Sequence, residues 1–447
     1  MIFTLSFMNK YIFGIGVPVL LIALGAFYCI RLRFFYFLHP IRIIKELFSK
    51  EKGGGVSSLK ALTLALAGTL GVGNMVGVAS AIALGGFGAV FWMWVSALVA
   101  MALKYAEIVL AMKYRKFDAD GKPYGAAMYY IKACFGNGGF GRALAAMFAL
   151  FCTFNAISMG SIIQVNSAAS ASKGVFNIPP LAVGLAFGLI ALFALCKGTK
   201  GVLSLTDKIV PVMTVGFVVL SLAVIFLNPK NASEAVLLIF KDAFSIRSAS
   251  GGVLGFLLSG GLRYGTMRGI LSNEAGCGTA PTAHAVSDCK SPARQGVWGI
   301  FEVFVDTILL CTLTAVVIII GYDGELAEKG NYMMMTVKAY SSSLGSLAGG
   351  FIALSVLLFG LATVLCWGYY GMQSVNYLSK RKWAGALFIA VYTVSLVLGP
   401  FMSGELIWEL ADLAIGGMSL INLTVLFLMR REVKNETELY FKRKNKS

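Results

Sequence analysis

Charge and histidine are both scarce in this sequence. Only 13% of the 447 residues are charged, about half the share of ~25% found in soluble globular proteins. Hydrophobic residues make up 58% of the chain. The two histidines, His39 and His284, are too few for a histidine-based metal site and offer little for nucleophilic catalysis. These shortages argue against an ordinary soluble enzyme and indicate a chain largely surrounded by lipid.

Enzyme motifs and paired cysteines are also missing. The eight cysteines are scattered, with no Cys-x-x-Cys pair, so we expect reduced, buried thiols. No Walker loop or nucleophile elbow occurs, and Gly71-x-Gly73-x-x-x-Gly77 is not the dinucleotide fingerprint. No cleavable signal peptide is evident, because the apolar run 11–30 is too long and lacks a small-residue cleavage site. We therefore predict a protein that is not an enzyme and has no organic cofactor.

What the chain does contain is a series of long apolar segments. A segment of about 20 apolar residues is long enough to cross a bilayer as a helix. We expect an all-α polytopic membrane protein with about eleven transmembrane helices. They lie near residues 11–30, 57–83, 87–112, 143–172, 179–196, 203–227, 251–285, 296–321, 347–378, 383–400 and 405–430.

The net charge of +17 is distributed as in a membrane protein, not a nucleic-acid-binding one. Most lysines and arginines fall in short loops on one side of the predicted spans, and such loops are usually cytoplasmic. We therefore expect a multi-pass protein of the cell membrane, with lipid as its surroundings and no nucleic-acid partner. The N-terminus should lie outside and the C-terminus inside, as an odd number of spans requires. We favour a monomer.

These patterns divide the chain into five parts. Residues 1–56 form an extra N-terminal transmembrane helix and a basic cytoplasmic loop, and residues 57–227 form a first set of five helices. An extracellular loop follows at 228–250, where 232–244 has the periodicity of a short amphipathic helix. Residues 251–430 form a second set of five helices. The tail 431–447 is charged, and we expect it to be partly disordered and to face anionic lipid.

Two of the spans are interrupted by glycines near their middle. The first break is Gly68–Asn74, and the second lies within Leu271–Thr279. Close helix packing through the small-residue pair Gly73 and Gly77 is an alternative explanation of the first. However, each break lies in the first helix of a set of five spans. Because five is an odd number, the two sets must insert with opposite topology. Broken helices at matching positions are typical of inverted-repeat transporters, whose ligands bind at the breaks.

The two breaks carry the residues that we expect to contact a ligand. Half-helix amides attract a carboxylate, and a small cation is coordinated by oxygen atoms. Glycine lets a ligand approach the main chain closely. The candidates for substrate binding are Thr69, Gly71, Gly73, Asn74, Asn273, Gly276, Cys277, Gly278 and Thr279.

Other spans add inward-facing polar candidates. Gln164 lies in the middle of its span, where it either lines the binding pocket or satisfies broken-helix backbone without a ligand. Thr363 and Trp367 are four residues apart and share a helix face, where the hydroxyl could bind a cation and the indole could wall the pocket. Ordinary helix packing is the alternative for both.

Charged residues inside the predicted spans are functional candidates by default. They are Lys104, Glu107, Arg263, Arg268, Glu274, Glu302 and Asp306. Lys104 and Glu107 are three apart on one helix, so they could simply pair. Glu274 is the carboxylate that lies in a break itself, where it could hold the backbone, bind a cation or carry a proton; we favour the structural role, with a base such as Arg268 as its partner. We therefore favour a sodium site of neutral oxygens over proton coupling, and both over a channel.

At these residues the chain resembles a known family. The stretch Gly68–Arg115, the motif Ser272–Pro281 with Ala283 and His284, and the motifs Gln164–Ser167 and Trp367–Gly371 are similar to the signature regions of the alanine or glycine:cation symporter family. This resemblance extends over nearly the whole chain. It implies the leucine-transporter fold, a 5+5 inverted repeat preceded here by one extra helix. It also implies sodium-coupled import of alanine or glycine by alternating access.

The resemblance also implies a site. One sodium ion would be held by the backbone around Ala67 and Leu70 and by the Thr363 hydroxyl. The amino acid would lie among Gly71, Gly73, Asn74, Gln164, Gly276 and Trp367.

Three positions depart from the pattern expected of the family: Phe87, Cys277 and Met372. Cys277 stands where methionine is usual, and a smaller side chain there could enlarge the pocket. This keeps open the alternative of a proton-coupled transporter with wider specificity, for example for glutamine or serine.

Overall fold

The computed structural model describes residues 15–48, 55–136, 138–244, 260–322, 332–402 and 404–444. Almost all of these residues are helical, as the composition predicts. The exception is a pair of two-residue antiparallel strands, β1 (Lys116–Phe117) and β2 (Pro123–Tyr124), which the sequence did not indicate.

The elements follow the order of the predicted spans. Up to residue 176 they are α2 (Val17–Arg31), α3 (Phe35–Leu38), α4 (Pro40–Phe48), α5 (Ser58–Thr69), η2 (Val72–Asn74), α6 (Val76–Gly85), α7 (Ala89–Tyr114), α8 (Ala127–Cys134), α9 (Gly139–Ile157), η3 (Ser158–Ile163) and α10 (Gln164–Phe176). From there to residue 320 they are α11 (Pro180–Cys196), α12 (Gly198–Leu227), α13 (Pro229–Ala243), α16 (Gly260–Asn273), α17 (Ala280–His284), α18 (Pro292–Val303), η4 (Phe304–Cys311) and α19 (Thr312–Ile320). The rest are α20 (Tyr332–Leu344), α21 (Ser346–Leu378), α22 (Lys382–Leu398), η5 (Gly399–Phe401), α23 (Gly404–Leu428) and α24 (Arg430–Lys444).

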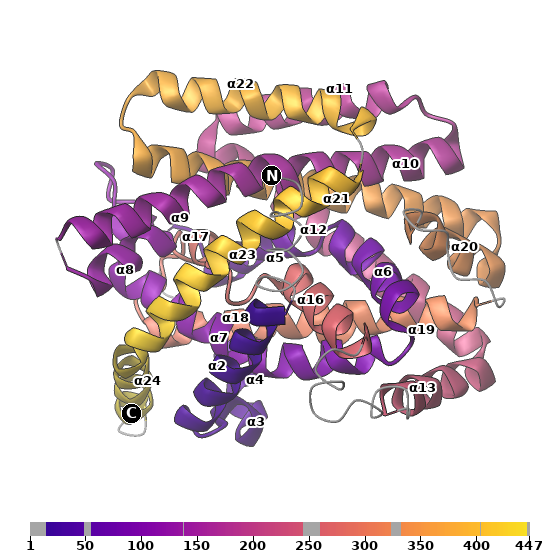
Figure 1. Cartoon of the computed structure of the whole chain (residues 1–447), viewed down its shortest axis with the longest axis horizontal. Helices are drawn as coiled ribbons and strands as arrows, with labels where there is room; N and C mark the ends of the chain where they lie inside the picture. The colour runs from indigo at the N-terminus through magenta and orange to yellow at the C-terminus, as the bar shows by residue number, and fades with distance from the viewer. Residues whose placement is uncertain are drawn as a thin grey trace.

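The long helices pack in two layers (Figure 1). In one layer, α21 packs on α9 and α10, and α22 packs on α11. In the other, α7 packs on α16 and α18, and α16 packs on α6. The broken helix α5–η2–α6 lies where the layers meet, because α5 contacts α21 and α12 while α6 contacts α16. The first break is therefore positioned between the two layers.

Small residues allow the helices of the second layer to approach closely. A Cβ added to Gly296 of α18 would lie 2.7 Å from the Tyr105 ring of α7, and one added to Gly265 of α16 would overlap the main chain of Ala89. In a bilayer, where lipid replaces water, such close backbone packing is a main source of helix association.

Both predicted breaks are present in the structure. Between α5 and α6 the chain bends by 62°, and Gly71 is extended (φ −115°, ψ −152°). Between α16 and α17 three residues have positive φ: Glu274 (53°), Gly276 (84°) and Gly278 (78°). The left-handed conformation costs a non-glycine residue about 1–2 kcal/mol, so Glu274 must be held there by its surroundings.

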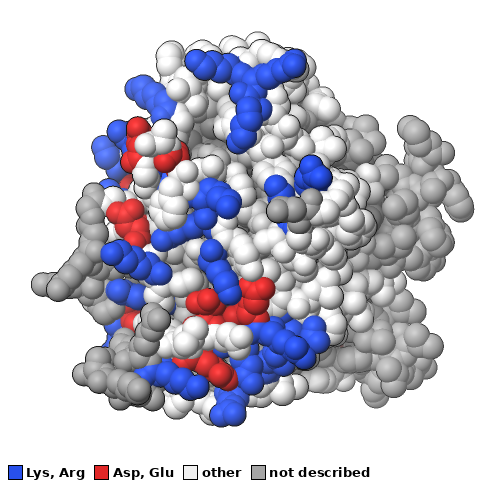
Figure 2. Space-filling view, turned by 90° about the vertical axis from the view of Figure 1, so that its left-hand side faces the viewer, with Lys and Arg blue, Asp and Glu red and all other residues white. Residues whose placement is uncertain are grey.

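One end of the molecule, which we call the basic end, is rich in charged side chains (Figure 2). The helices α8 and α24 lie at one end in Figure 1, and α13 and α20 lie at the other. The end with α8 and α24 carries many lysines and arginines, interspersed with acids (Figure 2). The helix α13 buries Ala232, Ala235, Ile239 and Ala243, a helical spacing that agrees with the amphipathic pattern seen in the sequence.

Two expectations need correction or remain open. The tail was expected to be partly disordered, but residues 430–444 form α24, which packs on α7 and α18. The count of eleven spans is not confirmed. Within the described ranges, seven helices are long and apolar enough to cross a membrane, or eight if the bent α5–α6 pair is one span, and α2 and α11 are shorter apolar helices.

Candidate functional site

The two breaks meet in the middle of the protein. A Cβ added to Gly73 would lie 3.7 Å from Cα of Ser272, so the gap between the two main chains is about one methyl group wide. Next to it, the Asn74 side-chain amide donates to the Ser272 hydroxyl across 3.2 Å. Residues about 200 positions apart in the sequence thus form one buried surface.

A third element, η4, joins the breaks through Asp306. One carboxylate oxygen of Asp306 accepts from Nδ2 of Asn74 (2.7 Å), and the other accepts from Ser272 (2.8 Å) and Thr307 (2.7 Å). The carboxylate is fully buried, and all of these donors are neutral. The Asn74 Oδ1 atom is also buried and has no hydrogen-bond partner among the described residues. We name Asn74, Ser272, Asp306 and Thr307 the junction cluster.

Sequence reasoning placed Asp306 among seven intramembrane charges but did not place it at the breaks. The reason is local: Asp306 lies in a π-helical segment, and Gln164 directly follows another, η3. Each π segment changes the helical register, so side-chain directions cannot be extrapolated at 3.6 residues per turn. The usable signal was the cost of a carboxylate in an apolar span.

The other face of the first break lies against the first layer. A Cβ on Gly71 would lie 2.5 Å from the Thr363 hydroxyl of α21 and 2.9 Å from Oε1 of Gln164. That same Oε1 atom accepts a hydrogen bond from the Val72 N–H (3.1 Å). Gln164 therefore satisfies broken-helix backbone in this structure, which was one of its two predicted roles.

The break also frees a carbonyl near Thr363. In a continuous helix the Gly71 N–H would donate to Ala67, but here it donates to Thr69 (2.8 Å). The Thr363 hydroxyl donates to Phe359 (3.0 Å), which leaves its lone pairs facing Gly71. A cavity of about 10 Å³ adjoins the break, lined by residues that include Leu70, Gly71 and Asn74. That is room for about one water molecule, so an amino acid needs the site to open.

Glu274 connects the second break to α21. Its carboxylate accepts from the Thr279 hydroxyl (2.6 Å) and from the Trp367 indole N–H (3.0 Å). All three side chains are buried. These two bonds, together with the donation of the Glu274 amide to Ile270 (2.8 Å), hold the left-handed conformation of Glu274.

The glycine part of the second break faces other helices. The Gly276 carbonyl accepts from Asn422 of α23 (2.9 Å), and the Cys277 thiol lies 3.4 Å from the Ser419 hydroxyl of α23. The Gly278 N–H donates to Glu107 of α7 (3.0 Å). The structure therefore does not bring Gly276, Cys277 and Gly278 to the first break, although it brings Ser272 there.

Two further candidates are held by local bonds. Thr69 donates to the Ala65 carbonyl one turn earlier (3.4 Å). Asn273 donates to Thr307 (3.2 Å) and accepts from the Ala275 amide (3.0 Å), so it links the second break to the junction cluster.

A buried ionic chain lies in the second layer, beside the second break. Lys104 pairs with Glu302 of α18 (3.2 Å). The predicted pairing of Lys104 with Glu107 is wrong, because Glu107 bonds to Gly278 and Asn422. Glu302 also contacts His284 of α17 (3.0 Å). This chain fixes α7, α17 and α18 to one another.

The larger space near the site is a polar pocket of about 640 Å³ at the basic end. It lies between the start of α5, the start of α12 and the last turns of α21. Its lining from α21 is a polar stripe of Tyr369, Gln373 and Asn376, spaced at helical intervals, and Lys380 follows just after the helix. The stripe begins at Tyr369, which is buried, and extends along the helix toward the end of α21.

The chemistry of the breaks is that of oxygen ligands. Main-chain carbonyls, hydroxyls and one carboxylate suit an alkali cation, and half-helix amides suit a carboxylate. Within the described residues, no three His, Cys, Asp or Glu side chains gather as a transition-metal site would need.

Comparison with known proteins gives consistent results. The model of the "Sodium:alanine symporter family" matches residues 2–447. The chain is 34% identical to "Sodium/alanine symporter AgcS" of Methanococcus maripaludis, over 97% of this chain and 95% of that protein. It is 34% identical to "Probable sodium/glutamine symporter GlnT" of Bacillus subtilis, over 95% of this chain and 88% of that protein. The crystal structure of MhsT in complex with L-phenylalanine superposes with a TM-score of 0.57 at 14% identity, covering 87% of this chain and 93% of that one.

Proposed function

We propose that this chain, which belongs to the sodium:alanine symporter family, imports a small neutral amino acid together with sodium ions. Its family and its leucine-transporter fold are those of multi-pass membrane transporters, and its relatives support cation-coupled amino acid symport. The observation that carries the proposal is the contact of two broken helices at a buried cluster of oxygen ligands.

We place one sodium ion between α5 and α21. Its ligands would be the carbonyls of Ala67 and Leu70 and the hydroxyl of Thr363. The proposal is supported by the interrupted helix, which frees the Ala67 carbonyl, and by the position of Thr363 against Gly71. Neutral oxygens of this kind replace the hydration shell of an alkali cation.

The amino acid would bind next to this ion, where the half-helix η2–α6 begins. Its carboxylate would take the Val72 N–H, and in the present structure Oε1 of Gln164 occupies that donor. Substrate binding would therefore displace Gln164 from the break. Asn74 and Ser272 would face the substrate from the junction cluster. Trp367 would form one wall of the pocket, and its hydrogen bond to Glu274 would hold the indole in place.

Asp306 supports a second candidate, coupling to a further cation or to a proton. A buried carboxylate without a cationic partner among its described contacts is costly, and the unpartnered Oδ1 of Asn74 offers another oxygen beside it. A sodium ion at the junction cluster would satisfy both groups. A proton on Asp306 would satisfy only the carboxylate.

The substrate would be released toward the basic end of the molecule. The polar stripe of α21 and the pocket of about 640 Å³ at this end support the proposal, because the pocket would be the space that the substrate enters on release. Because basic loops usually face the cytoplasm, we propose that this pocket is a cytoplasmic vestibule and that the C-terminus is inside. Alternating access would then exchange this opening for one at the end that carries α13 and α20.

Uptake of labelled alanine into proteoliposomes tests the proposal. We expect uptake that requires an inward sodium gradient and that is competed by glycine. Competition by glutamine or serine, or uptake driven by a proton gradient without sodium, would support the alternatives. Uptake that is indifferent to both gradients would contradict symport.

The variant Asp306→Asn separates the ion hypotheses. Loss of one charge beside a cation should raise the sodium concentration for half-maximal uptake at least about tenfold. If Asp306 carries a proton, the variant should lose its response to pH and retain its response to sodium. Asp207→Asn is the control, because this half-buried acid of α12 lies by Lys60 (3.9 Å), away from the junction cluster. Equal sodium dependence in both variants would remove Asp306 from the site.

A further inference from the structure

A second large pocket lies at the basic end, far along the chain from either break. It has a volume of about 590 Å³ and lies between the segment α2–α3–α4 and the C-terminal helix α24. Arg31, Arg33, Lys434 and Lys442 contribute positive charge to its lining, and Glu438 is the acid among the lining residues. This excess of positive charge is matched to an anion.

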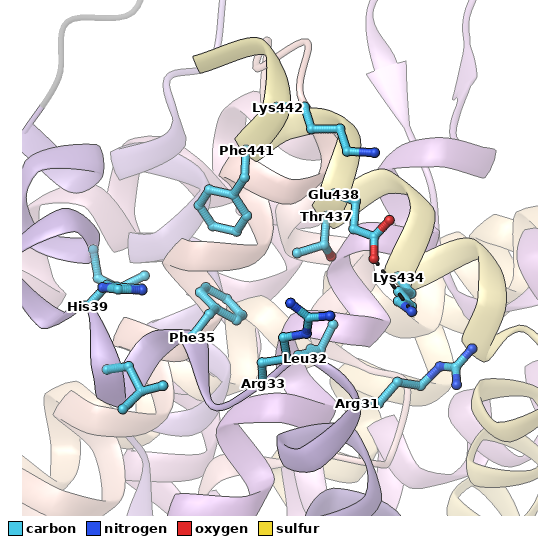
Figure 3. A pocket seen from close by; sticks show the side chains of 12 residues that line it. Arg31, Leu32, Arg33, Phe35, His39, Lys434, Thr437, Glu438, Phe441 and Lys442 are labelled. Atoms are coloured by element: carbon cyan, nitrogen blue, oxygen red, sulfur yellow. Dashed lines mark ion pairs between the residues drawn. The ribbon is translucent and has the colours of Figure 1, made fainter. Parts of the chain in front are cut away.

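The opposite wall of the pocket is mainly apolar, with His39 beside the aromatic rings (Figure 3). Figure 3 shows the rings of Phe35 and Phe441 on one side and the side chains of Arg31, Lys434 and Glu438 on the other, with Arg33 between them. The remaining lining includes Leu32, Leu38 and Ile43. A pocket that is basic on one side and apolar on the other suits a ligand with an anionic head and hydrocarbon chains.

The basic side chains are placed to meet such a head. Arg31 donates through Nε to the Arg430 carbonyl (3.2 Å), and this leaves its two Nη groups for a phosphate. Arg33 is exposed and follows the tight turn after α2, where its φ is 56°. Lys434 is partly neutralised by Glu438 (3.5 Å). Arginine is suited to bidentate contact with phosphate oxygens.

The pocket is built on fixed contacts. The Tyr105 hydroxyl of α7 lies 2.8 Å from the Thr437 hydroxyl of α24, and the Phe35 ring packs on Tyr105 (5.2 Å) and Phe441 (5.4 Å). Tyr440 donates to Glu46, which ties α24 to α4. The pocket walls therefore do not depend on a ligand to bring them together.

The surface beside the pocket is that of a membrane interface. The helix α4 buries Ile43 and Leu47 but exposes Ile41, Ile44 and Phe48, of which Phe48 is 85% exposed. One apolar face toward the protein and another toward the surroundings is expected of a helix lying in lipid. One helical turn before Arg31, the Phe27 ring of α2 packs on the Phe427 ring of α23, with 5.7 Å between the ring centroids. Phe427 is exposed. The exposed apolar side chains of α4 and α23 therefore provide a surface beside the pocket on which the acyl chains of a lipid could lie.

We propose that this pocket binds the headgroup of an anionic phospholipid at the cytoplasmic surface of the membrane, with Arg31 and Arg33 on its phosphate. The inference uses the orientation given under Proposed function, since anionic lipid is attracted by basic residues on the cytoplasmic side. It does not use the transport activity. A soluble phosphate compound would use the basic wall but would leave the apolar wall and the exposed face of α4 unexplained.

The test uses the full-length chain purified in a neutral detergent. Its melting temperature is measured while phosphatidylglycerol or phosphatidylcholine with the same acyl chains is titrated, and a parallel titration uses inorganic phosphate. We expect saturable stabilisation by phosphatidylglycerol alone. Stabilisation by phosphatidylcholine to the same degree, or by inorganic phosphate at the same concentration, would overturn the proposal.

Matched double variants assign the effect to the pocket. Arg31→Gln with Arg33→Gln should weaken phosphatidylglycerol binding about twenty-five-fold, because each cation near an anionic lipid is worth about a factor of five. Arg31→Lys with Arg33→Lys should retain most of the binding. Arg381→Gln with Lys382→Gln removes two exposed charges from the start of α22 and should retain all of the binding. Equal weakening in both glutamine pairs would mean non-specific surface attraction.

A single substitution of an exposed side chain keeps the proposal testable if the double arginine variant does not fold. Lys442→Gln should weaken binding about five-fold by the same reasoning, with lipid adducts counted by native mass spectrometry. Unchanged adducts in Lys442→Gln would count against the assigned pocket. Since none of these measurements requires uptake, a failure here leaves the symport proposal standing, and a failure of uptake leaves this one standing.

Discussion

The substitution Gly71→Ala tests whether the first break is a binding site. Gly71 has extended backbone angles that alanine also adopts, so the main chain is not the obstacle. The obstacle is space, because the new methyl group would lie 2.5 Å from Oγ1 of Thr363 and 2.9 Å from Oε1 of Gln164. One methyl group therefore acts on the two side chains that we place at the sodium ion and at the Val72 amide.

The size of the effect follows from these distances. Ordinary contact begins near ~3.4 Å, so the Thr363 hydroxyl must move by about 0.9 Å and the Gln164 oxygen by about 0.5 Å in a close-packed interior. Thr363 is β-branched, and its hydroxyl is bonded to Phe359, so its rotamer is restrained. Overpacking of this kind costs about 1–3 kcal/mol of stability. A displacement of about 1 Å in an oriented site can cost about a hundredfold in rate.

Gly77→Ala is the matched control. A Cβ there meets no atom within 4 Å, and alanine favours the helix α6 by up to about 1 kcal/mol over glycine. Sodium-driven alanine uptake in proteoliposomes, normalised to folded protein, should fall at least about tenfold in Gly71→Ala and stay unchanged in Gly77→Ala. If the two variants transport equally well, the contacts at Gly71 are packing contacts and the site lies elsewhere.

Two further substitutions test the supports of the site. Trp367→Phe removes the indole N–H that donates to Glu274 and should lower stability by about 1–3 kcal/mol, because a buried carboxylate oxygen loses its donor; a melting temperature equal to that of the unmodified chain would contradict this. Lys104→Gln removes the lysine that pairs with the buried Glu302, whose other contact is the His284 imidazole, and should cost about 3–5 kcal/mol. Adding Glu302→Gln should restore part of that loss, and a double variant no more stable than Lys104→Gln would show that the pair is not the cause.

The sequence was sufficient to locate the breaks but not their partners. Three glycines within Gly68–Gly73 weaken a helix wherever they occur, so the bend could be predicted. The alternative of close helix packing at Gly77 depended on the neighbours of this residue. In the described part of the structure, a Cβ added to Gly77 would have no atom within 4 Å, so no helix packs closely there. Similarly, the glycines of 276–278 predicted an interruption, but periodicity does not reveal that α7 and α23 bind that segment.

Gln164 and Asp306 show the second limit. Both were recognised as polar residues in apolar spans, yet neither could be assigned a neighbour. Each lies within or directly after a π-helical segment, whose extra residue per turn changes the direction of every later side chain. No residue type marks such a segment reliably, so the direction of Asp306 toward Asn74 comes from the structure alone.

Four consecutive residues of the first break, Gly71 to Asn74, contact both layers of helices. Gly71 and Val72 face α21 and Gln164, whereas Gly73 and Asn74 face Ser272 and Asp306. A ligand held there must engage both layers at once, so its binding free energy depends on how the layers are placed relative to each other. A ligand can shift a conformational equilibrium only by its difference in affinity for the two states. We therefore expect variants at Gln164 and at Asp306, on opposite sides of the break, to change the same coupling, so that their effects on sodium-dependent uptake are not additive.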